Sequence, residues 1–343
     1  MDKRENWIDS IKVLACTLIL VGHLVQGLQR TGILVRNGKF AFFLWFIYLF
    51  HVQLFFLCSG YLHEKKDKAG SLRDWLHYIG YKFVALGIPY FSFSLITWLL
   101  KSRFIDLVNI RTGHLIAFLF ASPALAQYWY LYTLFFLFLF IPNIKNNKIL
   151  IPLTVGFFGL YLISGKLVFS FALYSMAQYG FWFVLGMLMC NLGFGDLKKS
   201  ASLIFTSLVL IIIFTGTSCA LYSYGYRATF TIFTIILGTL ACLGLSMLFR
   251  YIEACGFYSR FVTLIAKYSF PIYLLHTIYA ASVRTLLIFT GVKSVWIHLL
   301  LGFTAGTAGS ILTAFIFEKM VYPEFIFYPW KVIKRVIKFS GNN

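Results

Sequence analysis

The sequence has 343 residues, of which 60% are hydrophobic and 12% charged, and its mean hydropathy is +0.82. That composition excludes a water-soluble globule, which needs a charged surface. The net charge of +19 does not indicate nucleic-acid binding, because the Lys and Arg residues are spread over short loops instead of gathering on one polar domain.

Ten apolar stretches recur along the chain, and each approaches the roughly 20 residues that a helix needs to cross a bilayer core of about 30 Å. They cover residues 8–28, 40–62, 76–100, 127–144, 148–165, 169–191, 201–221, 228–249, 264–289 and 295–317. Lipid offers no partner for open backbone groups, and the stretches lack the alternation of a barrel strand, so each is predicted to be a helix. The predicted fold is an all-α polytopic membrane protein with about ten transmembrane helices, in which residues 1–343 form one bundle domain.

The distribution of Lys and Arg over the predicted loops indicates the orientation. One side carries Lys3, Arg4, Lys65, Lys66, Lys68, Arg73, Lys145, Lys148, Lys198, Lys199, Arg250, Arg260, Lys319, Lys331, Lys334, Arg335 and Lys338. The other side carries fewer, among them Arg30, Arg36, Lys39, Lys101, Arg103, Arg111, Lys166, Arg227 and Lys293. Because cytoplasmic loops are enriched in Lys and Arg, both termini are predicted to be cytoplasmic.

The first stretch follows a basic start but has no small-x-small cleavage site, so it is predicted to be a retained helix and not a signal peptide. It carries Lys12 and His23 eleven residues apart, close to three whole turns, and therefore on one face. The rise between them is about 16 Å, which places Lys12 near the inner surface and His23 in the outer half of the bilayer. Asp9, three residues before Lys12, can pair with it. Two interpretations stay open: a polar cavity around His23, or a Lys12 that reaches the cytoplasm and a His23 that only bonds a neighbouring helix.

The second stretch contains FHVQLFFLCSGYL, which combines His51 at mid-depth with aromatic residues and with Ser59 and Gly60 near the inner end. A hydroxyl and an open backbone beside aromatic walls suit a narrow channel for an amide-bearing chain. The alternative is a helix contact made by small residues.

Ionisable residues are costly inside a membrane, so their uneven distribution marks the functional helices. The first, second, third and ninth stretches hold Asp9, Lys12, His23, His51, His77, Lys82, Lys267, His276 and Arg284. The stretches 201–221 and 228–249 hold no charged residue and no histidine, as suits lipid-facing scaffold. A polar cavity is predicted among the first, second, third and ninth stretches.

Three further segments carry local expectations. In the connection 101–126, the run LIAFLFASPALA is short for a crossing and is predicted to be re-entrant or interfacial. In the ninth stretch, KYSFPIYLLH places Pro271, which frees a backbone carbonyl, ahead of His276. The tail, residues 318–343, contains WKVIKRVIKF, a basic amphipathic pattern typical of a helix on the anionic inner leaflet.

The six cysteines mostly fall inside predicted helices and lack metal-ligand spacing. They are interpreted as packing residues. No metal site is predicted.

Several of these motifs together resemble one known family. WIDSIKVLACTLILVGH, FHVQLFFLCSGYL, YKFVALGIPYF, YWYL and SFPIYLLH are similar, in that order, to motifs of the acyltransferase 3 superfamily. The FH-x-x-LFFxxSGYL form is most similar to its fucose 4-O-acetylase-like branch. The resemblance implies a membrane enzyme, expected in the bacterial cytoplasmic membrane, that takes an acyl group, acetyl above all, from cytoplasmic acyl-CoA. The acceptor it implies is a hydroxyl of a cell-surface glycan or of its lipid-linked precursor, a form of polysaccharide O-acetylation.

The resemblance also implies roles for individual residues. His23 falls on the family's essential histidine, and Lys12 on the position where an arginine commonly stands. Ser59 and Gly60 match the FFxxSG element. Lys82 falls on the first basic position of the R-x-x-R motif.

The second basic position of that motif is Ala85 here, so Arg73 or His77 is the candidate to complete the coenzyme A phosphate site. A neutral imidazole is the usual general base for an alcohol, so His23 is assigned as the base. His51 is the candidate to assist it or to stabilise the oxyanion. Direct transfer and an acyl-histidine route both stay open.

Two other classes of function compete with the enzyme. A transporter or flippase for a glycan or lipid also needs a polar cavity, but the chain shows no corresponding halves. A non-catalytic receptor or scaffold does not need basic residues concentrated in the first three helices. The sequence leaves the sugar and the oligomeric state open.

Overall fold

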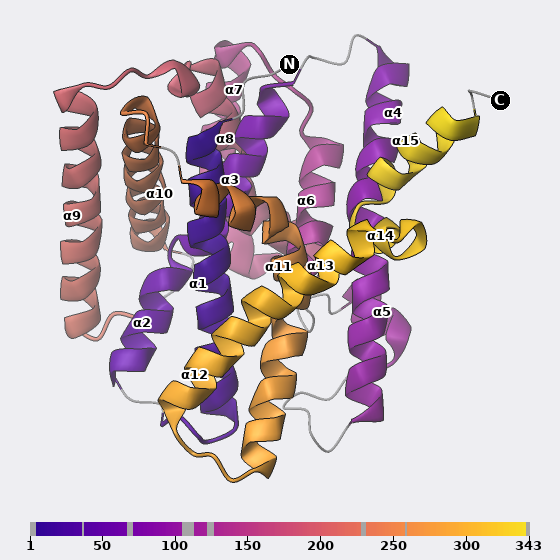
Figure 1. Cartoon of the computed structure of the whole chain (residues 1–343). Helices are drawn as coiled ribbons and strands as arrows, with labels where there is room; N and C mark the ends of the chain where they lie inside the picture. Colours follow the sequence, from indigo (N-terminus) through magenta and orange to yellow (C-terminus); the bar gives the residue numbers. More distant parts are fainter. Residues whose placement is uncertain are drawn as a thin grey trace. The chain divides into compact units, whose positions relative to one another are not determined.

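The protein is helical throughout the residues that its computed structural model describes, which are 5–35, 38–66, 71–104, 113–121, 127–227, 231–257 and 259–340 (Figure 1). The basic residues Lys3, Arg4, Arg36, Lys68 and Arg111, which entered the topology prediction, lie outside the described residues. The described ranges contain no strand, so the all-α membrane fold is confirmed.

Within the described ranges, nine spans are long and apolar enough to cross a membrane. Six are single helices: α1 Asn6–Arg30, α7 Asn147–Ile163 with its short extension to Lys166, α8 Phe171–Asn191, α9 Ala201–Ser223, α10 Ile232–Ala254 and α11 Arg260–Phe289. Three are built from consecutive pieces: α2 Gly38–Tyr48 with α3 His51–Glu64, α4 Leu72–Lys82 with η1 Phe83–Gly87 and α5 Ile88–Arg103, and α12 Val295–Thr304 with η7 Ala305–Gly309 and α13 Ser310–Glu318.

The stretch predicted at 127–144 forms a shorter helix, α6 Trp129–Phe140, of 12 residues. Ile141 is extended, with φ −117° and ψ 98°. Pro142 explains the early end, because a proline disfavours the α conformation in the residue before it. At 1.5 Å per residue, α6 spans about 18 Å, less than the thickness of a bilayer core.

The directions of the described helices support the prediction that α6 is also a crossing. The Cys16 thiol donates to the carbonyl of Ser269 over 3.6 Å, and the rings of His23 and His276 lie 5.3 Å apart. Seven residues forward along α1 therefore correspond to seven residues forward along α11, so the two helices are parallel. Among the described helices, α11 has the direction of α1 only if α6 is included, which makes α11 the ninth crossing.

Caps and a proline explain several boundaries. Ser71 accepts a hydrogen bond from the backbone of Asp74 at the start of α4, and Thr231 forms a capping box with Thr234 at the start of α10. The π turn η1 comes just before Pro89, whose ring cannot fit a regular helical turn and which donates no hydrogen bond. Lys82 therefore lies at the point where the third crossing widens.

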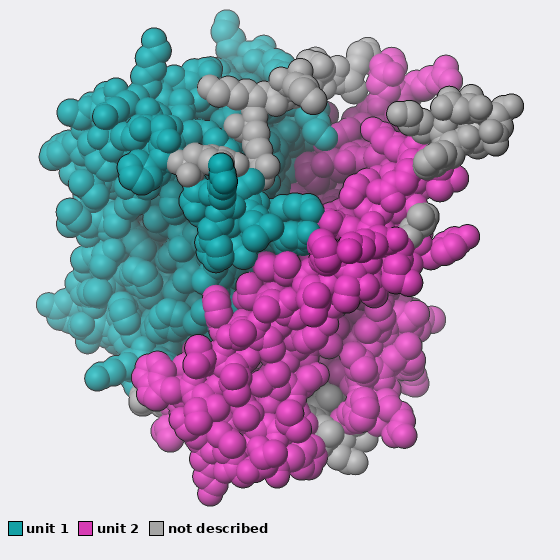
Figure 2. Space-filling model, viewed as in Figure 1, with its two compact units in different colours: residues 1–22, 36–68, 143–269 teal, residues 23–35, 69–142, 270–343 magenta. Residues whose placement is uncertain are grey.

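The chain divides into two compact units, coloured separately in Figure 2. Unit 1 contains residues 1–22, 36–68 and 143–269, and unit 2 contains residues 23–35, 69–142 and 270–343. In unit 1, α8 packs against α3 and α7, and α9 packs against α10. In unit 2, α6 packs against α4 and η1. The chain passes between the units within α1 and within α11, and the single-domain assignment stays a prediction.

Residues 113–121 of the connection 101–126 and residues 321–340 of the tail contain helical pieces in unit 2, and residues 105–112 lie outside the described residues. The connection contains the π turn η3 Ala117–Ala121, and the Tyr90 hydroxyl donates to the carbonyl of Leu119 over 2.5 Å, while residues 122–126 lie outside the described residues. The tail forms α14 Val321–Phe327 and α15 Pro329–Ser340. The carboxylate of buried Glu324 in α14 pairs with Lys331 at 2.7 Å and with Arg335 at 2.8 Å, which holds α15 in place.

Candidate functional site

Two histidines from distant parts of the sequence lie together in unit 2. His23 on α1 and His276 on α11 have ring centroids 5.3 Å apart and ring planes 39° apart. His276 is buried, with 1% of its surface exposed, whereas His23 is half-buried. A group that reaches His23 therefore also comes close to His276.

Hydrogen bonding determines which nitrogen of His276 is free. Its Nδ1 lies 2.8 Å from the carbonyl of Ile272 and 2.9 Å from that of Tyr273. Carbonyl oxygens only accept, so Nδ1 carries the hydrogen and Nε2 carries the lone pair. Within the described part of the chain, this buried Nε2 has no hydrogen-bond partner. An unsatisfied buried acceptor is costly, and it is suited to bind a donor that a substrate brings.

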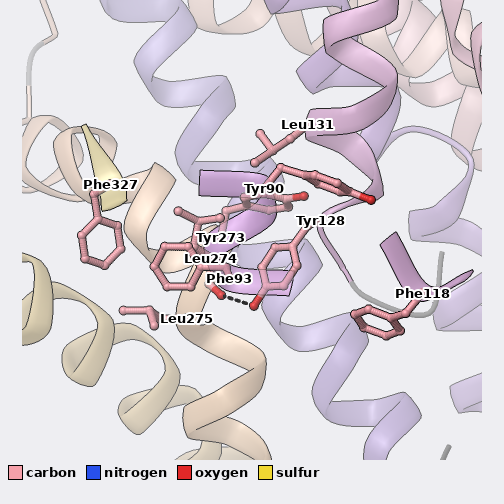
Figure 3. Close-up of a cluster of buried hydrophobic side chains, with 9 residues drawn as sticks. All are labelled: Tyr90, Phe93, Phe118, Tyr128, Leu131, Tyr273, Leu274, Leu275 and Phe327. Atoms are coloured by element: carbon pink, nitrogen blue, oxygen red, sulfur yellow. Dashed lines mark hydrogen bonds between the residues drawn. The ribbon is translucent and has the colours of Figure 1, made fainter. Parts of the chain in front are cut away.

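The backbone ahead of His276 is fixed by tyrosine hydroxyls. Tyr128 donates to the carbonyl of Leu274 over 3.0 Å (Figure 3). Its hydroxyl also lies 3.0 Å from the Thr97 hydroxyl. Tyr273 donates to the carbonyl of Gln127 over 2.6 Å. These bonds join α11 to α5 and to the start of α6, so they restrict rotation of the segment that carries His276.

A cluster of buried apolar and aromatic residues surrounds these bonds (Figure 3). Its members are Tyr90, Phe93, Phe118, Tyr128, Leu131, Tyr273, Leu274, Leu275 and Phe327. They come from α5, η3, α6, α11 and α14, so segments far apart in the sequence build one wall. Close packing of large rings gives this wall the rigidity that a positioned imidazole requires.

Lys12 and His51 lie in unit 1. The Lys12 ammonium is 4.0 Å from the Asp9 carboxylate, as the spacing predicts, and 30% of the Lys12 side chain is exposed. The His51 ring is buried, its Nδ1 lies 2.6 Å from the carbonyl of Ile47, and its ring meets Tyr48 edge-on at 4.7 Å. The assisting role of His51 toward His23 stays a prediction.

Gly60 lies at a close helix contact. A Cβ added there would collide with the carbonyl oxygen of Phe183 on α8, and a Cβ at Gly186 would collide with the carbonyl oxygen of Leu57 on α3. The two glycines thus let α3 and α8 approach backbone to backbone. Ser59 beside them is half-buried. Their role in a channel for the donor stays a prediction.

Lys82 lies among aromatic rings in unit 2. Its ammonium is 3.5 Å from the centre of the Phe138 ring and 5.3 Å from that of Tyr78, and such contacts stabilise a cation. Tyr81, the residue before it, packs edge-on against Trp330 of α15 at 5.2 Å. Arg73, the second residue of α4, is exposed. The basic tail helix therefore lies beside the element that carries Lys82.

The pairing of His23 with His276 is the feature that sequence reasoning missed. The signal available was SFPIYLLH, which places a histidine after a proline in a membrane helix, but nothing in the spacing says which helix it faces. The contact joins residues 253 positions apart, and only the tertiary structure supplies it.

Comparison with known proteins gives a family match over most of the chain. The profile of the acyltransferase 3 family, described as an acyltransferase domain, matches residues 5–318. The nodulation protein NolL of Mesorhizobium japonicum is 28% identical over 146 residues, which cover 41% of this chain and 36% of NolL. The match thus spans little more than a third of that relative. No solved structure matches.

Proposed function

Because this chain belongs to the acyltransferase 3 family, we propose that it moves an acetyl group from cytoplasmic acetyl-CoA to a hydroxyl of a cell-surface glycan or of its lipid-linked precursor. It is a multi-pass membrane acyltransferase. The donor, the acceptor and the bacterial cytoplasmic membrane are the proposed parts of this function.

The observation that carries the proposal is the contact between His23 and His276. Acyl transfer to an alcohol needs a base, because an alcohol is a poor nucleophile at neutral pH. His23 is half-buried and so within reach of a substrate, whereas the free Nε2 of His276 is buried beside it. One imidazole is accessible and the other is held rigidly next to it, an arrangement suited to a base with a positioning partner.

In the proposed reaction, each bond that forms is matched by one that breaks. His23 takes the proton of the acceptor hydroxyl as the oxygen forms a bond to the carbonyl carbon of the thioester. The carbon–sulfur bond breaks, and coenzyme A leaves as a thiolate that takes up the proton from His23, which returns the imidazole to its neutral form. The free Nε2 of His276 accepts a hydrogen bond from the His23 ring or from the acceptor hydroxyl, and so fixes its orientation.

The donor enters from the cytoplasmic end in this proposal. Lys82 and Arg73 bind the phosphates of coenzyme A through charge-assisted hydrogen bonds, and its pantetheine arm passes Ser59 and Gly60. Lys12 organises the inner part of this path. The cation–π contacts of Lys82 support this assignment, because they hold a cation where α4 ends, in the half of the third crossing that the predicted topology makes cytoplasmic.

Substitution of His23 tests the base. His23→Gln keeps size and hydrogen bonding but removes basicity, so the purified protein should lose about 10²–10⁴-fold in acetyl transfer while acetyl-CoA still raises its melting temperature. His51→Gln is the comparison, and it should lose less. Transfer by His23→Gln at a near wild-type rate would make the histidine structural and overturn the assignment.

Substitution of His276 separates positioning from packing. Asn places its amide near the position of Nδ1 and Gln places its amide near the position of Nε2. If Nε2 acts on His23 or the acceptor, His276→Gln should retain more activity than His276→Asn. The reverse order would mean that only the Nδ1 hydrogen bonds to Ile272 and Tyr273 matter.

A further inference from the structure

The guanidinium of Arg284 in unit 2 makes a close contact with the backbone of another helix. Arg284 on α11 is half-buried, and its guanidinium lies directly on the α1 backbone at Gly27. A Cβ added at Gly27 would collide with Nη1 of Arg284 and would lie 3.1 Å from its Cζ. Any residue other than glycine at position 27 would displace the guanidinium. The contact between Gly27 and Arg284 lies about one helix turn beyond His23 along α1.

The charged side chain next to Arg284 in this part of unit 2 is also positive. Across the described residues, Arg284 forms no ion pair and no hydrogen bond to an acid. Arg30 follows Gly27 by three residues on α1 and so adds a second positive charge on the same face of that helix. A charge inside a membrane span is costly unless a counter-charge offsets it. Two cations from two helices therefore point to an anion.

The sequence offers this end of the protein little counter-charge. Of the 11 acidic residues, Asp106 alone falls in a loop that the predicted topology places outside, where nine Lys or Arg residues were counted. Asp106 lies outside the described residues. An anion that neutralises this end has to come chiefly from another molecule.

We propose that Arg284, with Arg30, binds the phosphate or diphosphate of a lipid-linked sugar, so that the acceptor is membrane-anchored and anionic. This step rests on the proposed acyl transfer. Guanidinium groups bind phosphate through paired hydrogen bonds. Arg284 precedes the end of α11 at Phe289 by five residues, about 7.5 Å along the axis, which suits the depth of lipid phosphates.

The distance along α1 between His23 and the Arg284 guanidinium limits which sugar of the acceptor can reach the base. Gly27 follows His23 by four residues on α1, so the guanidinium lies about 6 Å along the axis from the base. A phosphate bound at Arg284 therefore brings the sugar attached to it, and not a distant sugar of a long glycan, to the imidazole. The acylated hydroxyl belongs to the phosphate-proximal sugar.

The test uses the full-length protein in phosphatidylcholine nanodiscs, with farnesyl diphosphate as the probe of a prenyl diphosphate. Wild type should bind it roughly 10- to 100-fold more tightly than Arg284→Gln, as expected for loss of hydrogen bonds to a charged group. Gly27→Ala should weaken binding too, because it displaces the guanidinium without removing it. Arg227→Gln, which removes an exposed arginine of unit 1, should bind like wild type.

Three results would overturn the proposal. One is equal affinity of wild type and Arg284→Gln, and another is an Arg227→Gln loss as large as that of Arg284→Gln. The third is displacement of the probe by phosphatidylglycerol in the nanodisc with the same dependence on Arg284, which would assign the site to ordinary lipid headgroups.

Acetyl-CoA provides a separate readout. It should raise the melting temperature of wild type and of both unit 2 variants alike, which also shows that they are folded. Absence of that effect in wild type, with diphosphate binding intact, would refute the acyl transfer and not the anion site.

Discussion

Lys82 packs against an aromatic ring and is still partly accessible to a ligand. Its ammonium lies over Phe138, yet the side chain is only half-buried. If Lys82 binds coenzyme A phosphates, Lys82→Glu should raise the apparent KM for acetyl-CoA by at least about tenfold with little change in kcat, because repulsion replaces attraction at a binding group. Steady-state kinetics on purified protein measures this.

The control for Lys82 is another basic residue of the predicted cytoplasmic side. Lys148→Glu makes the same charge change at an exposed position of unit 1 and should leave KM unaltered. Unchanged affinity of Lys82→Glu for acetyl-CoA would remove Lys82 from the donor site. An equal rise in both variants would indicate a general effect of surface charge.

At the scale of elements, the contact between α3 and α8 depends on two glycines. Gly60→Ala would force a methyl group into the Phe183 carbonyl, so the two helices would have to separate. Overpacking of this kind costs about 1–3 kcal/mol in unfolding free energy. Denaturation in mixed detergent micelles should show a corresponding loss of stability.

A matched glycine in the same unit separates packing from helix propensity. A Cβ at Gly216 of α9 meets nothing within 4 Å, so Gly216→Ala should be neutral or stabilise by roughly 0.5–1 kcal/mol. Equal stability of Gly60→Ala and wild type would mean that the α3–α8 contact is looser than the structure indicates. Activity of a stable Gly60→Ala protein would also report on the predicted donor channel.

At the scale of the whole molecule, the parallel directions of α1 and α11 support the prediction that α6 crosses despite its 12 residues. Ten crossings return the chain to the side where it began, and the excess of Lys and Arg predicts that this side is the cytoplasm. Reporter fusions at both termini should therefore report cytoplasm, and a tag inserted at Gly165 should be accessible from outside. An outside signal from either terminus would reverse the assignment of Lys82 to the donor side.

The sequence by itself determined the class and course of the fold. Length and hydropathy alone locate the crossings, because the bilayer fixes how many apolar residues a helix needs and lipid satisfies no backbone group. The sequence also contained the reason that α6 is short, because Pro142 ends the helix although the apolar run continues past it. His23 and Lys12 were identified from their spacing on one helix, which is a local property.

Only the tertiary structure decided what faces these residues. The contact of His23 with His276 and the seat of Arg284 on Gly27 join residues 253 and 257 positions apart. In lipid, neighbouring helices associate by close packing and not by a hydrophobic pattern, so a sequence rich in apolar residues leaves many pairings open. The shapes of the side chains at each contact select one helix pairing. The positions of the helices in the sequence do not reveal which pairing this is.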